Sequence, residues 1–142
     1  MGFDEAIENF NKFIKMQPNH SRAHFGLGNA LMVKGQLDLA MLEYRLSGKL
    51  DPTFAFPYMN MANIQMQTKN IPAAVENYQK ALKINPDLSA IHLSLGMIYY
   101  QFMNDATKAL GYLKEALRLN PNQEGAARLK SLIVELENKQ PA

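Results

Sequence analysis

Two histidines near the start of the chain stand four residues apart, the spacing at which two ring nitrogens on one helix face can hold a metal ion. They are His20 and His24, in a 142-residue sequence that has 3 histidines and no cysteine. A metal site needs further ligands, and no glutamate lies next to either histidine. We therefore predict that both histidines, and His92 later in the chain, are structural. The sequence indicates neither a metal nor a cofactor.

The residues that could serve acid–base or nucleophilic catalysis are scattered. Carboxylates such as Asp38 and Glu43 fall on helix faces where solvation explains them, and no serine stands in a nucleophile-type turn. Gly26-x-Gly28 lies inside an expected helix and precedes no phosphate loop, so close packing explains both glycines. The sequence therefore predicts no catalytic residues and no enzyme activity.

Charge and hydropathy exclude two further classes of protein. The 15 Lys and Arg residues and 13 Asp and Glu residues give a net charge of +2 and are mixed along the chain, whereas nucleic-acid binding concentrates basic residues on one face. No apolar run approaches the ~18 residues that a membrane-spanning helix needs. The N-terminus has no basic stretch followed by an apolar one, so no signal peptide is expected. The cytoplasm is the default location, and it stays open if the chain is part of a longer protein.

A repeat of about 34 residues organises the chain. Pro18, Pro52, Pro86 and Pro121 follow one another at spacings of 34, 34 and 35 residues. Twelve residues before each proline stands an alanine, and four residues after that alanine comes a large apolar side chain: Ala6 and Phe10, Ala40 and Tyr44, Ala74 and Tyr78, and Ala109 and Leu113.

Each full repeat is expected to form two helices. Gly28, Ala62 and Gly96 are small residues in the same column of the repeat, and a large apolar residue precedes each of them. Apolar residues then recur at helical spacing along one stripe of the first helix. The second helix ends before the proline, which cannot continue it. Strand patterns are missing, so the fold class is all-α.

The pattern His24-x-x-Leu27-Gly28-x-x-Leu31, with counterparts that begin at Tyr58 and His92, resembles the tetratricopeptide repeat. This resemblance implies a right-handed solenoid of antiparallel helix pairs, a TPR-like superhelix. It also implies a scaffold for protein–protein interaction rather than an enzyme. Gln65, Ser47 and Phe13 depart from the residues usual at their columns, and one extra residue lies near Asn104.

The repeat predicts one TPR-like domain over residues 1–142. It consists of an N-terminal half repeat (3–18), three full repeats (19–52, 53–86 and 87–121) and a C-terminal capping helix (123–139) with Leu129, Leu132, Ile133 and Leu136 on one face. The half repeat would expect a preceding helix against its apolar face. We expect the chain either to be cut from a longer array, which we favour, or to pair this end with another copy. The residues for such self-association are Phe3, Ile7, Phe10 and Phe13.

The first helices line the concave wall of the solenoid in this family, and here that wall is apolar. Its expected partner-binding residues are Phe25, Asn29, Met32, Phe56, Met59, Asn60, Asn63, Met66, Leu93, Met97 and Tyr100. Methionine recurs on surfaces that accept varied apolar partners. A separate set of residues already fills the core stripe, so we predict a Met-rich groove for a peptide or helical segment. Packing, contact with the cap, or an oligomer interface is the alternative.

The asparagines of this wall allow two comparisons. Tyr58-x-Asn60-x-Ala62-Asn63 is similar to the repeats of the O-linked N-acetylglucosamine transferase, whose asparagine ladder holds peptide backbone, and solvated polar residues are the alternative. Co-chaperones of the family instead clamp the terminal carboxylate of heat-shock proteins with basic residues. Phe25, Ala90 and Ser94 occupy those basic positions here, so this function is not expected.

Three functions follow from the sequence. We favour a protein-binding scaffold with an apolar groove. The alternatives are a module that self-associates through its N-terminal helix and a substrate-recruiting segment of a larger enzyme such as a glycosyltransferase. The expected partner is a protein or peptide, with no nucleic acid and no membrane insertion.

Overall fold

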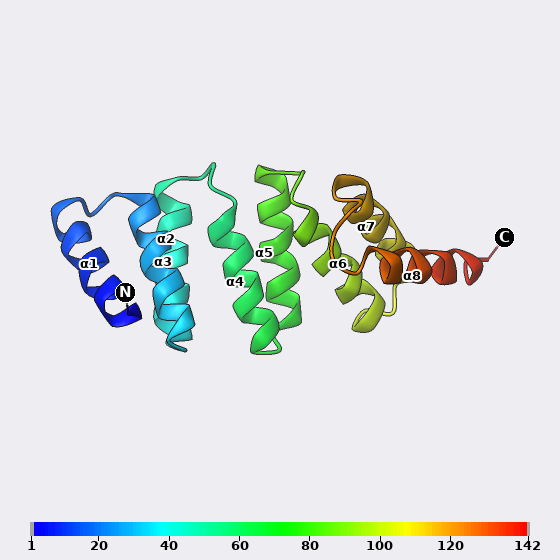
Figure 1. Ribbon diagram of the computed structural model, residues 1–142, viewed down its shortest axis with the longest axis horizontal. Coiled ribbons are helices and arrows are strands. Elements are labelled where there is room, and N and C mark those ends of the chain that lie inside the picture. Colours follow the sequence, from blue (N-terminus) through cyan, green and yellow to red (C-terminus); the bar gives the residue numbers. More distant parts are fainter. Residues whose placement is uncertain (1, 142) are drawn as a thin grey trace. The chain divides into compact units, whose positions relative to one another are not determined.

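The computed structural model describes residues 2–141, which form eight helices and no strand (Figure 1). The all-α prediction is confirmed. The helices are α1 (Phe3–Met16), α2 (Ser21–Val33), α3 (Leu37–Leu50), α4 (Phe56–Gln67), α5 (Ile71–Ile84), α6 (Ser89–Gln101), α7 (Ala106–Leu119) and α8 (Ala126–Asn138). They fall into two compact units, Met1–Ile84 and Asn85–Ala142.

In the first unit α1 to α5 lie side by side in chain order, and each helix packs against the next (Figure 1). The α2–α3 turn passes through Gly35 at a φ of 77°, a left-handed conformation that glycine adopts without strain. One cluster joins both helix pairs, and its buried members are Leu27, Leu31, Ala40, Tyr44, Met61 and Ile64. Of the alanines and large apolar residues that define the repeat, Ala40, Tyr44, Ala74 and Tyr78 are therefore core residues of this unit, whereas Ala6 and Phe10 are half-buried.

The small residues of the repeat let the two helices of a pair approach closely. A Cβ atom on Gly28 would lie 2.7 Å from Cε1 of Tyr44, and Tyr44 is fully buried. In the second unit a Cβ atom on Gly96 would lie 2.5 Å from Cδ2 of Leu113. The close packing predicted for this column is thus what the structure shows.

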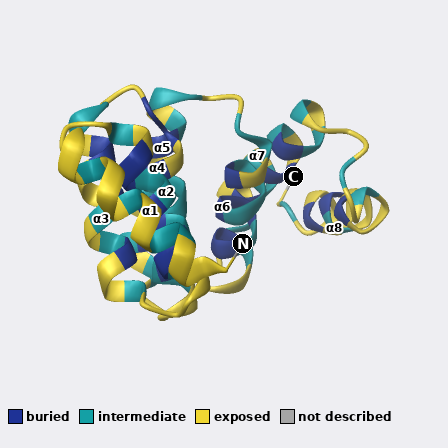
Figure 2. Cartoon of the chain, turned by 60° about the vertical axis from the view of Figure 1, so that its left-hand side comes forward, coloured by how far each residue is buried: buried dark blue, intermediate teal, exposed yellow. Residues whose placement is uncertain are grey.

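In the second unit α6 packs against α7, and α7 packs against α8. Asp105 caps α7 by accepting a hydrogen bond from the backbone nitrogen of Lys108 at 3.0 Å. The last helix begins at Ala126, three residues after the start expected at 123, because the chain first turns through Gly125 at a φ of 77°. Figure 2 shows its buried residues along one side of the helix; they are Leu129, Ile133 and Leu136.

Within residues 2–141 no helix combines the length and the apolar character that crossing a membrane requires.

Candidate protein-binding surfaces

The residues expected to bind a partner lie on α2 and α4 in the first unit and on α6 in the second. All eleven keep some exposure to solvent, and Phe56 is the most exposed of the aromatic ones at 41%. None is shut into the core. They form two stretches, one on each unit: Phe25, Asn29, Met32, Phe56, Met59, Asn60, Asn63 and Met66 on the first, and Leu93, Met97 and Tyr100 on the second.

Helix α4 is apolar on two faces. One face is buried and carries Met61 and Ile64, which are 4% and 3% exposed. The other face carries Phe56, Met59 and Met66, which stay partly exposed. An amphipathic helix needs only one apolar stripe to join a core, so this second apolar face is additional to the stripe that packs in the core of this unit.

An aromatic cluster that the sequence analysis did not predict covers part of the expected partner-binding surface beside α2. Phe54, in the segment between α3 and α4, is only 5% exposed and packs edge to face on Phe25 with ring centroids 4.9 Å apart. Phe56 continues the cluster at 5.9 Å from Phe54, and the guanidinium of Arg22 lies 3.6 Å from the centroid of the Phe54 ring. Phe25 is therefore partly covered by its own chain. An aromatic residue directly after Asp51-Pro52-Thr53 was the available signal.

Two of the three asparagines, Asn29 and Asn63, accept hydrogen bonds from buried tyrosines. The hydroxyl of Tyr44 donates to Oδ1 of Asn29 at 2.7 Å, and Nδ2 of Asn60 donates to the same oxygen at 2.9 Å. One repeat further on, the hydroxyl of Tyr78 donates to Oδ1 of Asn63 at 2.5 Å. Burial raises the pKa of Tyr44, and the side-chain amide of Asn60 opposes that shift. Asn29 and Asn63 thus satisfy buried hydroxyls, a role that the sequence analysis did not assign to them.

The third repeat replaces both members of this pair together. Leu113 stands in the column of Tyr44 and Tyr78, and Met97 stands in the column of Asn29 and Asn63. Leu113 is fully buried and has no hydroxyl, so no acceptor is needed beside it. An asparagine therefore occurs where the second helix presents a hydroxyl, and an apolar residue occurs where it does not.

Two of the predicted binding residues line a pocket of about 290 Å³ inside the second unit. Leu93 and Met97 of α6 form one wall, and Leu129 and Leu132 of α8 form another. Arg128 and the Gln123–Gly125 turn complete the lining. Two residues predicted for the groove and two residues of the capping helix therefore line the same pocket.

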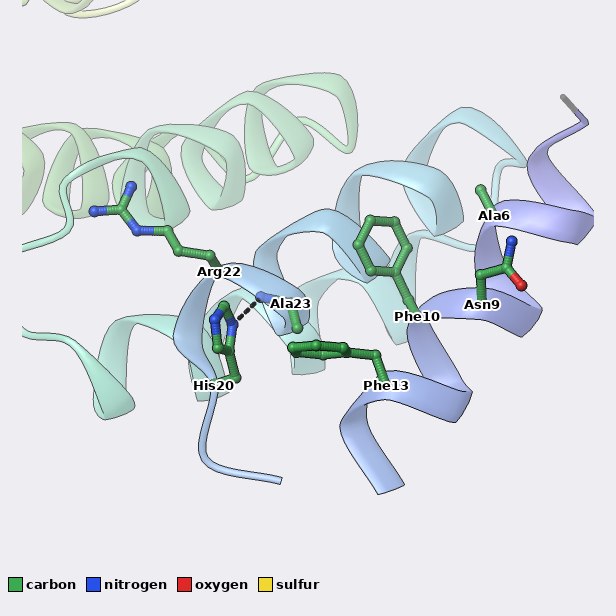
Figure 3. A pocket seen from close by; sticks show the side chains of 7 residues that line it. All are labelled: Ala6, Asn9, Phe10, Phe13, His20, Arg22 and Ala23. Carbon is green, nitrogen blue, oxygen red and sulfur yellow. Dashed lines mark hydrogen bonds between the residues drawn. The ribbon is translucent and has the colours of Figure 1, made fainter. Parts of the chain in front are cut away.

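A larger pocket, of about 510 Å³, lies between α1 and the start of α2 (Figure 3). Its walls are mostly apolar and come from Ala6, Asn9, Phe10 and Phe13 of α1 and from His20, Arg22 and Ala23. Phe13 meets His20 edge to face with ring centroids 5.1 Å apart, and the ring of Phe10 lies against Gly26. Of the four residues predicted for self-association, Phe10 and Phe13 line this pocket, Ile7 is half-buried, and Phe3 is 53% exposed.

The two histidines that suggested a metal pair form hydrogen bonds with other residues of the chain. His20 caps α2, because its Nδ1 accepts a hydrogen bond from the backbone nitrogen of Ala23 at 3.0 Å (Figure 3). His24 is buried, with Nε2 2.7 Å from the carbonyl oxygen of Pro18 and Nδ1 2.7 Å from Oε2 of Glu43. Nε2 of His92 bonds the carbonyl oxygen of Pro86 in the same way, at 2.8 Å. Among residues 2–141 no three His, Asp or Glu side chains are grouped to hold a metal ion.

Comparison with protein families identifies the repeat. Sequence models of the tetratricopeptide repeat match residues 2–53 and 89–123, and a model described as a TPR repeat matches residues 62–101. The chain belongs to the tetratricopeptide repeat family. The resemblance seen in the sequence is thereby confirmed, and the matched segments include α1, α2, α3, α5, α6 and α7 in full and α4 from residue 62 onward.

The curated relatives of this TPR chain are much longer proteins. It is 27% identical over 113 residues to the CTR9 homolog of Arabidopsis thaliana, covering 77% of the chain and 10% of that protein. It is 28% identical over 143 residues to the human protein O-mannosyl-transferase TMTC3, covering 96% of the chain and 15% of that protein. It is 30% identical over 84 residues to the Hsp70-Hsp90 organizing protein 3 of A. thaliana, covering 59% of the chain and 15% of that protein. The TPR chain thus spans about a tenth to a seventh of the length of these relatives.

Solved structures share the fold. The crystal structure of MamA superimposes with a TM-score of 0.80 at 24% identity, over 96% of this chain and 79% of that chain. The structure of pilF from Pseudomonas aeruginosa gives a TM-score of 0.81 at 24% identity, over 96% of this chain and 62% of that chain. Together with the relatives, this TPR-like solenoid fold supports a protein-interaction scaffold with protein partners.

Proposed function

We propose that this TPR segment is a non-enzymatic scaffold whose first helices bind an apolar, extended or helical segment of a partner protein. The observation that carries the proposal is the second apolar face of α4. Phe56, Met59 and Met66 stay partly exposed while Met61 and Ile64 on the other face fill the core. Exposed apolar surface of this kind is commonly a site of interaction.

Chemistry at this surface favours an apolar guest. Methionine side chains are flexible and polarisable, so they adapt to partners of differing shape. The amide of Asn29 adds a polar contact: its oxygen already accepts two hydrogen bonds, which leaves its nitrogen for a peptide carbonyl. A few buried apolar anchors of this kind support an affinity near micromolar, about −8 kcal/mol.

A clamp for a terminal carboxylate does not fit these residues, although a heat-shock organizing protein is among the relatives. Phe25, Ala90 and Ser94 occupy the basic positions of that clamp, so charge-assisted hydrogen bonds to a carboxylate are missing. Phe25 is also packed against Phe54 and Tyr44. The partner segment proposed here therefore binds through side chains within its sequence rather than through its terminal carboxylate.

The relatives support a second candidate function. The chain resembles two human O-mannosyl-transferases, TMTC1 at 30% identity and TMTC3 at 28% identity, and covers 11% and 15% of their lengths. A TPR segment of a larger enzyme would use the same surface to recruit the protein substrate. Both candidates require that α4 or α6 contacts a polypeptide guest.

Peptides selected from a random twelve-residue display library against the 142-residue chain provide the probe. Binding of the selected peptides is measured by fluorescence anisotropy for wild type, Met59→Glu and Met97→Glu. The matched controls, Gln67→Glu and Gln101→Glu, place the same charge at exposed polar positions of the same helices. We expect at least a tenfold loss of affinity in either methionine variant, about 1.4 kcal/mol, with circular dichroism unchanged and the controls like wild type.

Two results would contradict the proposal. If both methionine variants lose their helical signal, Met59 and Met97 are core residues and the surface is not a binding site. If selected peptides bind all five proteins equally, the guest contacts another part of the chain.

A further inference from the structure

The pocket beside α1 has a counterpart one repeat further on, where the structure shows what fills it. Ala6, Asn9, Phe10 and Phe13 stand 34 residues before Ala40, Glu43, Tyr44 and Ser47 of α3. These side chains of α1 line an open pocket (Figure 3), whereas the equivalent face of α3 is packed against α2.

The contacts of α2 on α3 define what an occupant needs. Ser21 bonds Ser47, with hydroxyl oxygens 3.0 Å apart, and His24 bonds Glu43. Gly28 lies directly against the ring of Tyr44. An occupant of the α1 pocket is therefore a helix like the first helix of a repeat, with a small residue placed against the ring of Phe10.

The pairing seen in the three full repeats adds a second requirement. The residue after the small one is an asparagine bonded to Tyr44 or Tyr78 in the first two repeats, and it is a methionine in the repeat whose second helix carries Leu113. Phe10 has no hydroxyl, so its partner at this position should be apolar, because an asparagine would be left with an unpaired carbonyl oxygen.

Helix α8 meets both requirements. In each full repeat the small residue follows the repeat proline by ten positions, as Gly28 follows Pro18, and ten positions after Pro121 stands Ser131. The next residue is Leu132, which is apolar. The same face of α8 also carries Ala127 and Val134, and Ala127, Ser131 and Val134 are all exposed, Val134 at 56%.

We propose that α8 of one copy docks into the α1 pocket of a second copy, so that copies of this chain associate head to tail. Ser131 then lies against the ring of Phe10, with Leu132 beside it. Arg128 takes the place that Phe25 holds beside Tyr44, where its guanidinium can stack on a phenyl ring, as Arg22 does on Phe54. The contact joins two different surfaces, so it is heterologous and can be repeated from copy to copy.

Lys130 is the residue of α8 that fits this contact least well. It stands in the column of Leu27, Met61 and Leu95, which are 4%, 4% and 0% exposed. A lysine at the edge of such a contact lays its aliphatic stem on apolar surface and keeps its ammonium group in water. The association is therefore weakened by this residue, and Lys130→Leu should strengthen it.

Sedimentation velocity of the 142-residue chain tests the proposal with one variant for each surface. Asn9→Trp fills the pocket without removing an apolar contact, and Ser131→Arg blocks α8; both positions are exposed. We expect wild type to associate within about 1 to 500 µM, the range of weak specific interfaces. Each variant alone should be monomeric, and an equimolar mixture of the two should form a 1:1 dimer and nothing larger.

That rescue is specific to a head-to-tail contact, because each variant keeps one intact surface. Lys130→Leu should lower the dissociation constant at least tenfold, and adding Asn9→Trp to it should abolish the gain. The matched controls are Asn11→Trp on α1 and Asn138→Leu on α8, at exposed positions outside the lining of the α1 pocket, and both should behave as wild type. Phe13→Asp is a second pocket variant in case Asn9→Trp fails to fold.

Three results would overturn the proposal. A wild-type chain that stays monomeric throughout this range has no such contact. Association that survives Ser131→Arg and is lost with Asn9→Trp is a symmetric pairing through α1. If Lys130→Leu strengthens self-association and adding Asn9→Trp does not reverse that change, the stronger association is non-specific contact of the exposed leucine. The peptide-binding test uses Met59 and Met97, which lie outside the α1 pocket, so the two proposals can fail independently.

Discussion

The hydrogen bond between Tyr44 and Asn29 gives the sharpest test of how this repeat is held together. Tyr44 is fully buried, and its hydroxyl donates to Oδ1 of Asn29 at 2.7 Å. The sulfur of Met32, 3.7 Å away, is the only other acceptor that the described residues offer this hydroxyl, and a thioether is a weak one. The two substitutions Tyr44→Phe and Asn29→Met remove one member of the pair each, and together they imitate the apolar pairing of the third repeat.

The structure sets the size of each effect. Tyr44→Phe removes one hydrogen bond and leaves Asn29 with its bond from Asn60, so it should cost about 1 kcal/mol. Asn29→Met leaves a buried hydroxyl with a poor acceptor and removes the bond from Asn60, so it should cost about 2 to 3 kcal/mol. In the double variant no hydroxyl is left unsatisfied. Its cost should therefore fall short of the sum by about 1 kcal/mol.

Urea unfolding followed by circular dichroism measures these differences in the free energy of unfolding. In a separate thermal unfolding experiment, a change of 1 kcal/mol should move the midpoint by about 4 °C. The control cycle combines Asn29→Met with Tyr78→Phe, whose hydroxyl bonds Asn63 instead. That control should be additive. If the changes in unfolding free energy caused by Tyr44→Phe and Asn29→Met are equally additive, the hydrogen bond contributes nothing to stability. The pairing rule, by which an asparagine occurs where the second helix carries a tyrosine, then has no physical basis.

Three further outcomes follow from the same structure. Gly111→Ala should raise the free energy of unfolding by about 0.5 to 1 kcal/mol, since Gly111 lies exposed within α7 with open space around it. Gly28→Ala should destabilise by about 1 to 3 kcal/mol, because its Cβ would lie 2.7 Å from the Tyr44 ring; equal effects of the two substitutions would show that the close approach is not required. Burial raises the pKa of Tyr44 above its ordinary value of 10.0, so folding favours the neutral hydroxyl. The stability from this group is full below about pH 10 and is lost as the pH rises through the folded-state pKa, so denaturant midpoints between pH 8 and 11 should fall more steeply for wild type than for Tyr44→Phe.

The elements of this fold could be predicted because a few residue types carry the physical constraint. Proline ends each second helix, and a glycine or alanine permits close contact within each pair, so the spacing of these residues places the helices. The segment between α3 and α4 was not predictable in the same way. Phe54 lies outside the helices, where no periodicity applies, and only its contacts with Phe25 and Phe56 show that it is a core residue. The start of α8 was misplaced by three residues because Gly125 adopts a left-handed turn that the sequence pattern does not announce.

The roles of the asparagines could have been found in the sequence, and the reason they were missed bears on the binding surface. Asn29 and Asn63 were interpreted from their position on the wall alone, as groups for a peptide backbone. Their column varies together with the column fifteen or sixteen residues later, where the residues are Tyr44, Tyr78 and Leu113. Comparing columns between repeats, rather than residues along one helix, would have paired each asparagine with a hydroxyl. The same comparison pairs Leu132 of α8 with Phe10 of α1, two apolar residues from different ends of the chain. If the pairing rule holds within each repeat, it also describes the contact by which one copy would continue the repeat of another.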